Sequence, residues 1–181
     1  MSASNRHVAL LRGINVGGKN VLVMKDLARL FVESGCSEVR TYIQSGNVVY
    51  SASATVAWKA PTLLPAAIER EFGFAIPIQT RSAAELRAVV AGNPLLADHE
   101  EPALAVMFLA QAPTAKQIAA LDPDRSPGDT FVVRGREIYL ACPNGFARTK
   151  LTNTWFDTRL GTISTARNWR TTTKLLELVG G

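Results

Sequence analysis

The amino-acid sequence predicts an α+β fold made of two ferredoxin-like halves, each with the element order βαββαβ and an antiparallel sheet. Two segments, 7–12 and 103–109, are apolar on both faces, which is typical of central strands covered on both sides. Each is followed by a helical pattern and then by a pattern of two alternating strands joined by a turn. The repeated order of elements, rather than any identity of residues, is what indicates two halves.

The first half is predicted to span residues 1–81 and to begin with the strand at 7–12. Residues 24–35 carry the apolar stripe of a helix, with Gly35 at its C-terminal end. These two elements open the βαββαβ order.

A hairpin is predicted over residues 38–52, where two alternating strands flank the turn Ser45-Gly46-Asn47. Either Gly46 or Asn47 can supply the positive φ angle that a tight turn needs. The hairpin therefore provides the second and third strands of the first half.

The end of the first half is predicted as a loop, a helix and an edge strand. Residues 51–60 are expected to form the loop. Residues 61–72 are expected to form a helix that starts at Pro61, where the missing N–H does no harm. Residues 75–81 have a strand pattern, and Pro77 within it favours a position at the edge of the sheet.

A linking helix and loop are predicted over residues 82–102, before the second half at 103–181. The second half opens with the strand at 103–109 and continues with a helix at 113–121, for which Thr114 is a plausible N-cap.

The remaining elements repeat the order of the first half and add one helix. A second hairpin is predicted over 129–141, followed by a helix at 149–160 capped by Thr149. A short extended segment at 162–166 and a last helix at 169–179 complete the chain. Since a lone ferredoxin-like sheet leaves one face open, we expect the open faces to cover each other or to be covered by a partner chain, so an oligomer is compatible with the sequence.

Composition points to a globular protein with anionic partners. Of the 181 residues, 47% are hydrophobic and 19% are charged, which suits a packed core. No apolar stretch reaches the roughly 20 residues of a membrane span, and the N-terminal segment lacks the pattern of a signal peptide. We therefore expect a cytoplasmic protein that does not enter the membrane. The net charge of +5 favours small anionic molecules or nucleic acid as partners, although a merely basic surface explains it equally.

Cysteine and histidine are too few and too scattered to suggest a metal centre. Cys36 and Cys142 lack metal-ligand spacing and are expected to be buried thiols. His7 and His99 lie far apart in the sequence, and zinc needs three or four ligands. The sequence therefore predicts neither a metal nor a cofactor.

The topology brings two distant loops together. Right-handed crossovers place the strands at 7–12 and 47–51 side by side and antiparallel, so the loop after the first strand and the tip of the first hairpin lie at the same end of the sheet. We expect one polar patch there, rich in donors and poor in negative charge, which suits an anion. The ligand-binding residues predicted in it are Arg12, Asn15, Gly17, Gly18, Lys19, Gln44, Ser45 and Asn47.

The loop in this patch matches part of a phosphate-binding P-loop. Gly13, Gly18 and Lys19 have the spacing G-x-x-x-x-G-K, but Asn20 stands where a Mg²⁺-binding Ser or Thr is required. A P-loop also needs a helix that opens directly at Gly-Lys, whereas residues 21–23 read as extended. A strand-to-helix turn that matches by chance is favoured, with an anion site of another kind as the alternative.

Three stretches, ALLRGINVGGKN, YIQSGNVVY and TARNWRTTTKLLEL, resemble in order a bacterial family known as domain of unknown function 1697. The resemblance extends over nearly the whole chain. It implies two ferredoxin-like halves and brings no established activity, cofactor or substrate. It also marks Arg167, Asn168 and Trp169 as motif positions.

The last of these stretches has two interpretations. Arg167 and Arg170 could neutralise phosphates while Trp169 stacks on a base, and on this interpretation Arg167, Asn168 and Trp169 join the predicted ligand-binding residues. Alternatively the segment is a helix entry, with Asn168 as the cap and Trp169 in the core.

Two further groups of residues also have more than one interpretation. Arg148 and Lys150, next to the cap at Thr149, would hold a phosphate or carboxylate at a helix start, or else they lie in a solvated loop. Ser45 is the one hydroxyl in its hairpin turn, but a nucleophile needs a base within reach and the sequence names none.

Two functions follow from these patterns. The first is a non-catalytic binding module for an anionic ligand, such as a nucleotide, RNA or a phosphorylated metabolite, at the patch of the glycine-rich loop and hairpin. The second is a small enzyme that acts on a phosphorylated or carboxylated small molecule in the same cleft. Whether the protein is an enzyme is left open.

Overall fold

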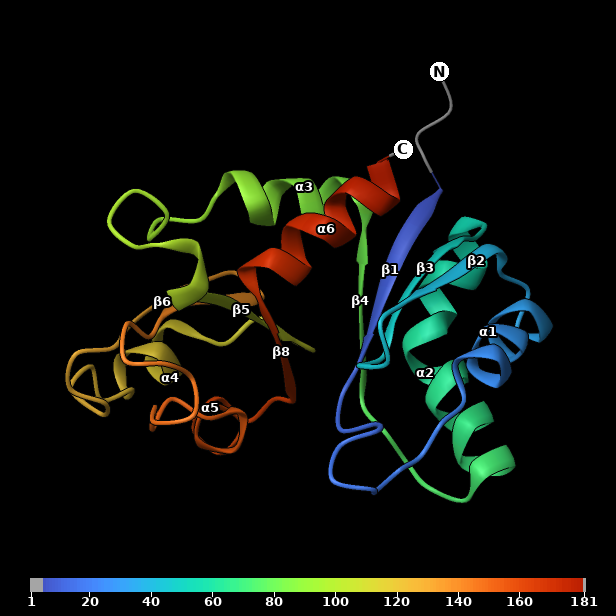
Figure 1. The fold of residues 1–181 in the computed structure, drawn as a ribbon, viewed down its shortest axis with the longest axis horizontal. Helices are drawn as coiled ribbons and strands as arrows, with labels where there is room; N and C mark the ends of the chain where they lie inside the picture. Colours follow the sequence, from blue (N-terminus) through green and yellow to red (C-terminus); the bar gives the residue numbers. More distant parts are fainter. Residues whose placement is uncertain (1–4, 181) are drawn as a thin grey trace. The chain divides into compact units, whose positions relative to one another are not determined.

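The computed structural model describes residues 5–180 and confirms an α+β fold with two four-stranded antiparallel sheets, each in a βαββαβ order, followed by a C-terminal helix (Figure 1). The chain divides into two compact units. The first unit comprises the described residues up to Ala88 together with those from Leu175 onward, and the second is Val89–Lys174. No helix within residues 5–180 combines the length and the apolar character that crossing a bilayer requires.

The first unit contains the sheet with strand order β2-β3-β1-β4. Its elements are β1 (Arg6–Leu11), α1 (Met24–Glu33), β2 (Ser37–Tyr42), β3 (Asn47–Ser51), α2 (Ala54–Phe72) and β4 (Ile78–Ser82). The predicted pairing of the central strands is confirmed, because β1 and β3 are antiparallel with Val8 opposite Val49. Strand β4 lies at the sheet edge, as the adjacent Pro77 indicated.

Helices α1 and α2 cover one face of this sheet (Figure 1). The apolar side chains on the inner faces of these helices, which include Phe31 and Ile68, pack on Ala9 and Leu11 of β1. Successive strand residues point to opposite faces, yet the intervening Val8 is also completely buried. The doubly apolar pattern of the first strand therefore corresponds to burial on both of its faces.

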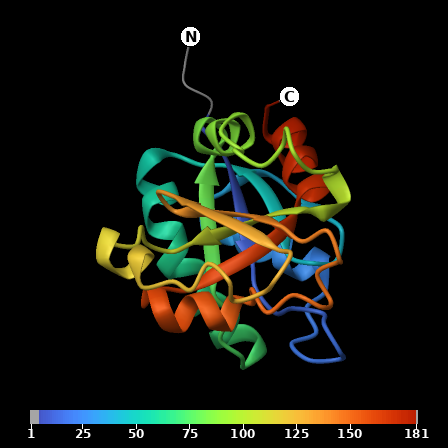
Figure 2. The same cartoon turned by 90° about the vertical axis from the view of Figure 1, so that its left-hand side faces the viewer.

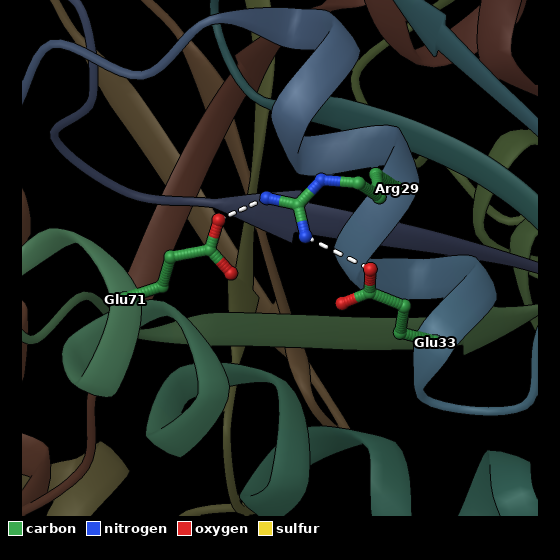
Figure 3. Close-up of polar contacts among 3 residues, drawn as sticks. All are labelled: Arg29, Glu33 and Glu71. Atoms are coloured by element: carbon green, nitrogen blue, oxygen red, sulfur yellow. Dashed lines mark hydrogen bonds and ion pairs between the residues drawn. The ribbon is translucent and has the colours of Figure 1, made fainter.

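An exposed ionic contact joins the two helices. Arg29 of α1 donates to Glu33 one turn later at 2.9 Å and also to Glu71 of α2 (Figure 3). Exposed ion pairs contribute little to stability, so the apolar stripes rather than this bridge hold α1 and α2 on the sheet.

The start of α2 corrects the sequence prediction. A loop was expected at 51–60 and a helix from Pro61, but the helix begins at Ala54. The Ser53 side chain caps it by accepting a hydrogen bond from the Val56 amide at 3.3 Å. The helix continues through Pro61, which loses only one backbone donor, and ends as predicted at Gly73 in the left-handed conformation.

The second unit repeats the arrangement with strand order β6-β7-β5-β8. Its elements are the short 3-10 helix η1 (Glu101–Ala103), β5 (Leu104–Leu109), α4 (Ala115–Ala119), β6 (Thr130–Arg134), β7 (Glu137–Ala141), α5 (Asn153–Leu160) and β8 (Ser164–Asn168). Two helices, α3 (Ala83–Ala91) and α6 (Trp169–Gly180), contribute residues to both units.

The two sheets also agree in register. In the first, Val8 of β1 faces Arg81 of the edge strand β4. In the second, Val106 of β5 faces Arg167 of the edge strand β8. The two halves are therefore equivalent down to single residue positions, although their sequences show no clear repeat.

Aromatic packing anchors the helices of the second unit. Trp155 and Phe156 of α5 contact each other and Phe131 of β6 in edge-to-face geometry, with centroids 4.7–6.0 Å apart. Helix α4 lies beside α5 (Figure 2), and Gln117 donates to the Leu160 carbonyl at 2.8 Å. The predicted cap at Thr114 is present as a capping box with Gln117.

The start of α5 is the second correction. The helix was expected to run over 149–160 with Thr149 as its cap, but it begins at Asn153 and Thr152 is the cap. The Thr152 hydroxyl accepts from the Trp155 amide at 3.2 Å, whereas the Thr149 hydroxyl accepts from the nearby Leu151 amide. Thr149 therefore stabilises a local turn outside the helix.

Candidate functional site

Hydrogen bonds join the glycine-rich loop to the tip of the first hairpin. The Asn15 side-chain amide donates to the Gln44 carbonyl at 3.0 Å. The Leu11 amide, at the end of β1, donates to the Gly46 carbonyl at 2.8 Å. We call residues 12–20 and 43–47 together the loop–hairpin patch, and the two segments are neighbours, as the topology indicated.

Asn15 acts as the brace of this patch. Besides its bond to Gln44, its side chain donates to the Leu22 carbonyl at 3.0 Å and accepts from the Leu22 amide at 2.8 Å. Its backbone is left-handed, with φ of 54°, a conformation that asparagine tolerates better than most residues. The side chain therefore uses three of its four hydrogen-bonding capacities within the protein.

The tip of the glycine-rich loop is a tight turn. Gly17 and Gly18 have φ angles of 58° and 73°, and the Lys19 amide donates to the Val16 carbonyl at 3.1 Å. Positive φ at both central residues defines a type I′ turn, which glycine adopts without steric cost. At the base of the loop, the Asn20 side chain donates to the Gly13 carbonyl.

The hairpin tip depends on Gly46. Its φ is 76°, and a Cβ atom there would lie 2.7 Å from the Leu11 Cβ. Both the backbone angle and the close approach of β1 exclude larger residues. Of the two residues considered for the turn, Gly46 is the one with positive φ.

Asn47 lies behind the tip and is completely buried. Its side-chain amide donates to the Ser45 hydroxyl at 2.9 Å and to the Tyr42 carbonyl at 3.2 Å. Asn47 thus holds the turn in shape, and Ser45 accepts a hydrogen bond from it. Among the described residues, neither of these hydrogen bonds brings a general base to the Ser45 hydroxyl.

The remaining predicted residues of the patch face solvent to different degrees. The exposed ones are Gly17, Gly18, Lys19, Gln44 and Ser45. Arg12 is half-buried, and its amide donates to the Pro77 carbonyl at 3.0 Å. The patch contains two cations and no carboxylate, so its electrostatic character is positive.

Arg167, Asn168 and Trp169 belong to the second unit. Asn168 caps α6, because its side-chain oxygen accepts from the Thr171 amide at 2.8 Å. Trp169 is buried, so stacking on a base would first require it to be exposed. Arg167 donates to the Thr165 hydroxyl and the Ala166 carbonyl. Burial lowers the pKa of its guanidinium to about 10, which still leaves it cationic at neutral pH.

The geometry of the loop differs from that of a P-loop. Residues 21–23 are not helical, and α1 starts at Met24 with Val23 in an extended conformation at its cap. No helix N-terminus therefore meets Gly18 and Lys19, as the extended pattern at 21–23 predicted.

The other reactive groups that the sequence singled out are structural. Cys36 and Cys142 are buried free thiols, and burial raises the pKa of both, that of Cys36 to about 11. They are therefore poor nucleophiles at neutral pH. Within residues 5–180, no three His, Cys, Asp or Glu side chains lie close enough together to hold a metal ion.

Sequence reasoning missed the role of Thr152 and Asn153 at the start of α5. Both residues line a cavity in the second unit. The sequence offers no signal that separates Thr152 from Thr149, because both are good cap residues and each is followed three residues later by an amide that it could accept from.

The fold and the patch define a two-unit α+β protein with an exposed, positively charged loop. Residues 4–139 match the family described as "Protein of unknown function (DUF1697)", and the chain belongs to that family. A similar solved structure is that of the conserved bacterial protein SP0830 from Streptococcus pneumoniae. It is 20% identical, with a TM-score of 0.74 over 96% of this chain and 98% of that one. At this identity the likeness concerns the fold alone. The comparison with curated proteins returns no match.

Proposed function

We propose that this protein is a binding module for an anionic ligand, a nucleotide, RNA or a phosphorylated metabolite, held at the loop–hairpin patch. The observation that carries the proposal is that two joined segments expose donors and a cation without any carboxylate. Lys19 is exposed beside the Gly17–Gly18 turn, and Arg12 lies at the base of the same loop. Backbone amides in such turns and nearby cations are the groups that bind phosphate.

The bracing of the loop supports binding. Asn15 and Asn47 hold the loop and hairpin through hydrogen bonds to backbone groups, so little further ordering is required when a ligand binds. Pre-organisation of this kind increases affinity because less conformational entropy is lost. Exposed aliphatic side chains at Val16 and Ile43 (67% and 51% exposed) offer contact to the apolar part of a ligand, such as a nucleobase.

The chemistry of the patch favours binding over catalysis. Its titratable side chains are Arg12 and Lys19, and it contains no His, Cys, Asp or Glu. General acid–base catalysis needs a group that exchanges a proton near neutral pH. A small enzyme acting on a phosphorylated or carboxylated molecule is the alternative function, and it would need a base from outside the patch. Turnover of such a compound would favour this alternative.

The test measures binding of a labelled RNA of about ten nucleotides, and of AMP as a competitor, at several salt concentrations. The Lys19→Ala variant should bind RNA more weakly and reduce the slope of log K against log salt by about one, because one phosphate contact is lost. The Arg12→Ala variant should weaken binding without unfolding the protein.

The matched control is Lys59→Ala, which removes the same charge from α2, outside the patch. It should reduce affinity less than Lys19→Ala does. Equal losses from both lysine variants would mean that net charge alone attracts the RNA. If neither RNA nor AMP binds, the patch is not an anion site.

A further inference from the structure

A cavity of about 420 Å³ lies over the sheet of the second unit, next to the start of α5. Small-molecule sites usually have volumes of about 300–1,000 Å³ and mostly apolar walls with a few polar groups. This cavity has that character, because its floor consists of apolar strand residues and most of its remaining lining comes from residues 146–153. The floor residues are Ala105 and Met107 of β5, Leu140 of β7 and Ala166 of β8.

The registers of the two sheets identify the positions of the first unit that are equivalent to this floor. In the first unit, His7 of β1 lies opposite Tyr50 of β3. In the second unit, Ala105 of β5 lies opposite Leu140 of β7. Each pair stands one residue before the valine of the central strand that faces the arginine of the edge strand. The pair His7 and Tyr50 therefore corresponds to the pair Ala105 and Leu140.

Aromatic rings fill the equivalent place in the first unit. The rings of His7 and Tyr50 are stacked with their centroids 5.4 Å apart, and Phe31 of α1 meets the Tyr50 ring edge to face at 5.3 Å. In the second unit the two strand positions hold Ala105 and Leu140, which carry no ring. The covering helices are also shorter, since α4 has 5 residues against 10 in α1, and α5 has 8 against 19 in α2. The cavity therefore lies where the first unit places its own rings.

The cavity presents no charged side chain to a ligand. Arg167 is part of the lining, but it alternates with Ala166 and Asn168 along β8, so its side chain points to the opposite face of the sheet. Its guanidinium donates to Thr165, which lies on that opposite face as well. Within the described part of the chain, the other lining residues include no Asp, Glu, His, Lys or Arg. A charged ligand would lose its hydration here without gaining a partner, so the cavity favours an uncharged one.

Two polar side chains of the lining can still donate hydrogen bonds. The Thr152 hydroxyl accepts from the Trp155 amide at 3.2 Å, which leaves its own hydrogen to be donated. The Asn168 side-chain oxygen accepts from the Thr171 amide at 2.8 Å, which leaves its side-chain nitrogen as a donor. A ligand with an acceptor oxygen, in a hydroxyl or carbonyl group, matches these donors.

We propose that this cavity binds a small uncharged aromatic molecule, a ring that carries one hydroxyl or carbonyl group. The ring lies on Ala105, Met107 and Leu140 and takes the place that aromatic side chains fill in the first unit. The oxygen of the ligand accepts a hydrogen bond from Thr152 or Asn168. This site is separate from the loop–hairpin patch and does not depend on the proposed function.

The first experiment titrates the whole protein with p-cresol, the side-chain analogue of tyrosine, and follows methyl groups by NMR. The ring current of p-cresol should shift the methyl signals of Met107, Leu140 and Ala166 most strongly. The anionic control 4-hydroxybenzoate and the cationic control 4-hydroxybenzylamine have similar shapes and should bind at least about tenfold more weakly, because the cavity offers no charged partner. Equal binding of the three compounds would overturn the proposal, and so would the absence of shifts at these methyl groups.

The second experiment fills the cavity by substitution. Leu140→Tyr introduces the ring that the first unit holds at the equivalent position, and Ala166→Leu fills the cavity from the edge strand β8. Each variant should weaken p-cresol binding at least about tenfold, and circular dichroism checks that it folds. Ala166→Leu provides the test on its own where the larger substitution disturbs folding.

The matched control for these variants is Ala119→Leu, the same substitution at an exposed position of α4 outside the lining. It should leave p-cresol binding within about twofold of the wild type. A folded cavity-filling variant that binds p-cresol as tightly as the wild type would refute the proposal. An equal loss of binding in Ala119→Leu would refute it too.

A cross-check separates this site from the loop–hairpin patch. Lys19→Ala should leave p-cresol binding unchanged, and Ala166→Leu should leave the salt dependence of RNA binding unchanged. Loss of RNA binding with p-cresol binding intact would remove the proposed function and keep the cavity. The opposite result would do the reverse.

Discussion

At the scale of single residues, asparagine is the type that most shapes the loop–hairpin patch. Asn15 and Asn47 lie at positions where an amide side chain suits either a ligand or the backbone. Both face the backbone, Asn15 towards Leu22 and Gln44, and Asn47 towards Tyr42. The donors that remain for a ligand therefore come from Arg12, Lys19 and exposed backbone rather than from these amides.

Replacing Asn15 by alanine should destabilise the protein by about 2 kcal/mol, because three hydrogen bonds are lost and alanine disfavours a positive φ. Urea unfolding monitored by circular dichroism measures the change. Asn15→Gly separates the two effects, since glycine keeps the backbone angle and loses only the hydrogen bonds. It should fall between the wild type and Asn15→Ala. Unchanged stability in Asn15→Ala would show that the brace is unimportant.

At the scale of elements, α2 is the least expected part of the fold. It runs for 19 residues and contains Pro61 and Pro65 in its interior. Proline removes a backbone donor and its ring crowds the carbonyl four residues earlier. The helix forms nevertheless, because Ser53 caps it and because Ala60, Leu64 and Ile68 are buried against the sheet. Tertiary packing therefore overrides local propensity here.

Pro61→Ala should raise the stability of the protein by about 1–3 kcal/mol, since the position is exposed and alanine restores the missing donor and favours the helix. Thermal unfolding measures the shift. Thr62→Ala, at the neighbouring exposed position, controls for the gain in helix propensity alone and should have a smaller effect. A lower melting temperature for Pro61→Ala would mean that the proline is needed in the folded state.

At the scale of the whole molecule, the division into units does not follow the chain from end to end. Residues from Leu175 onward belong with the first unit, although they follow the whole of the second unit in the sequence. Within this last part of α6, Leu175 and Val179 are completely buried. The first unit therefore includes a late segment of the chain in its packing.

Removing residues 175–181 should destabilise the first unit most. Each buried Leu or Val contributes roughly 1.5–3 kcal/mol on burial. Hydrogen exchange should show a greater loss of protection for the amides of β1 than for those of β5. A chain that lacks only residues 180 and 181 is the control and should behave like the wild type. An equal loss of protection in both strands would contradict this assignment of α6.

Features of the fold that depend on local interactions could be predicted from the sequence, whereas features that depend on distant contacts could not. The turn at Gly46 could be predicted, because a positive φ limits the choice of residue. The choice between Thr149 and Thr152 as the cap of α5 could not, since both are good caps. In the structure Thr152 is the cap, and the Lys150 amide, before the helix, donates to the Ser126 hydroxyl 24 residues earlier in the chain.

The candidate site shows the same limit. That the glycine-rich loop and the hairpin tip meet could be predicted from topology alone. That Asn15 braces the patch could not, because only the distances from its side chain to Leu22 and Gln44 distinguish a brace from a ligand contact. The cavity beside α5 was likewise outside the reach of sequence, since its lining comes from strands and loops that are distant along the chain.

The agreement in strand order between the two sheets provides an internal measure of how much chain the fold requires. From β1 to α1 the chain takes residues 12–23, twelve in all, whereas the equivalent step from β5 to α4 takes only the five residues 110–114. Five residues therefore suffice to connect the strand to the helix in this fold. The glycine-rich loop of the first half is longer than the fold requires, and the second half shows the same fold without it.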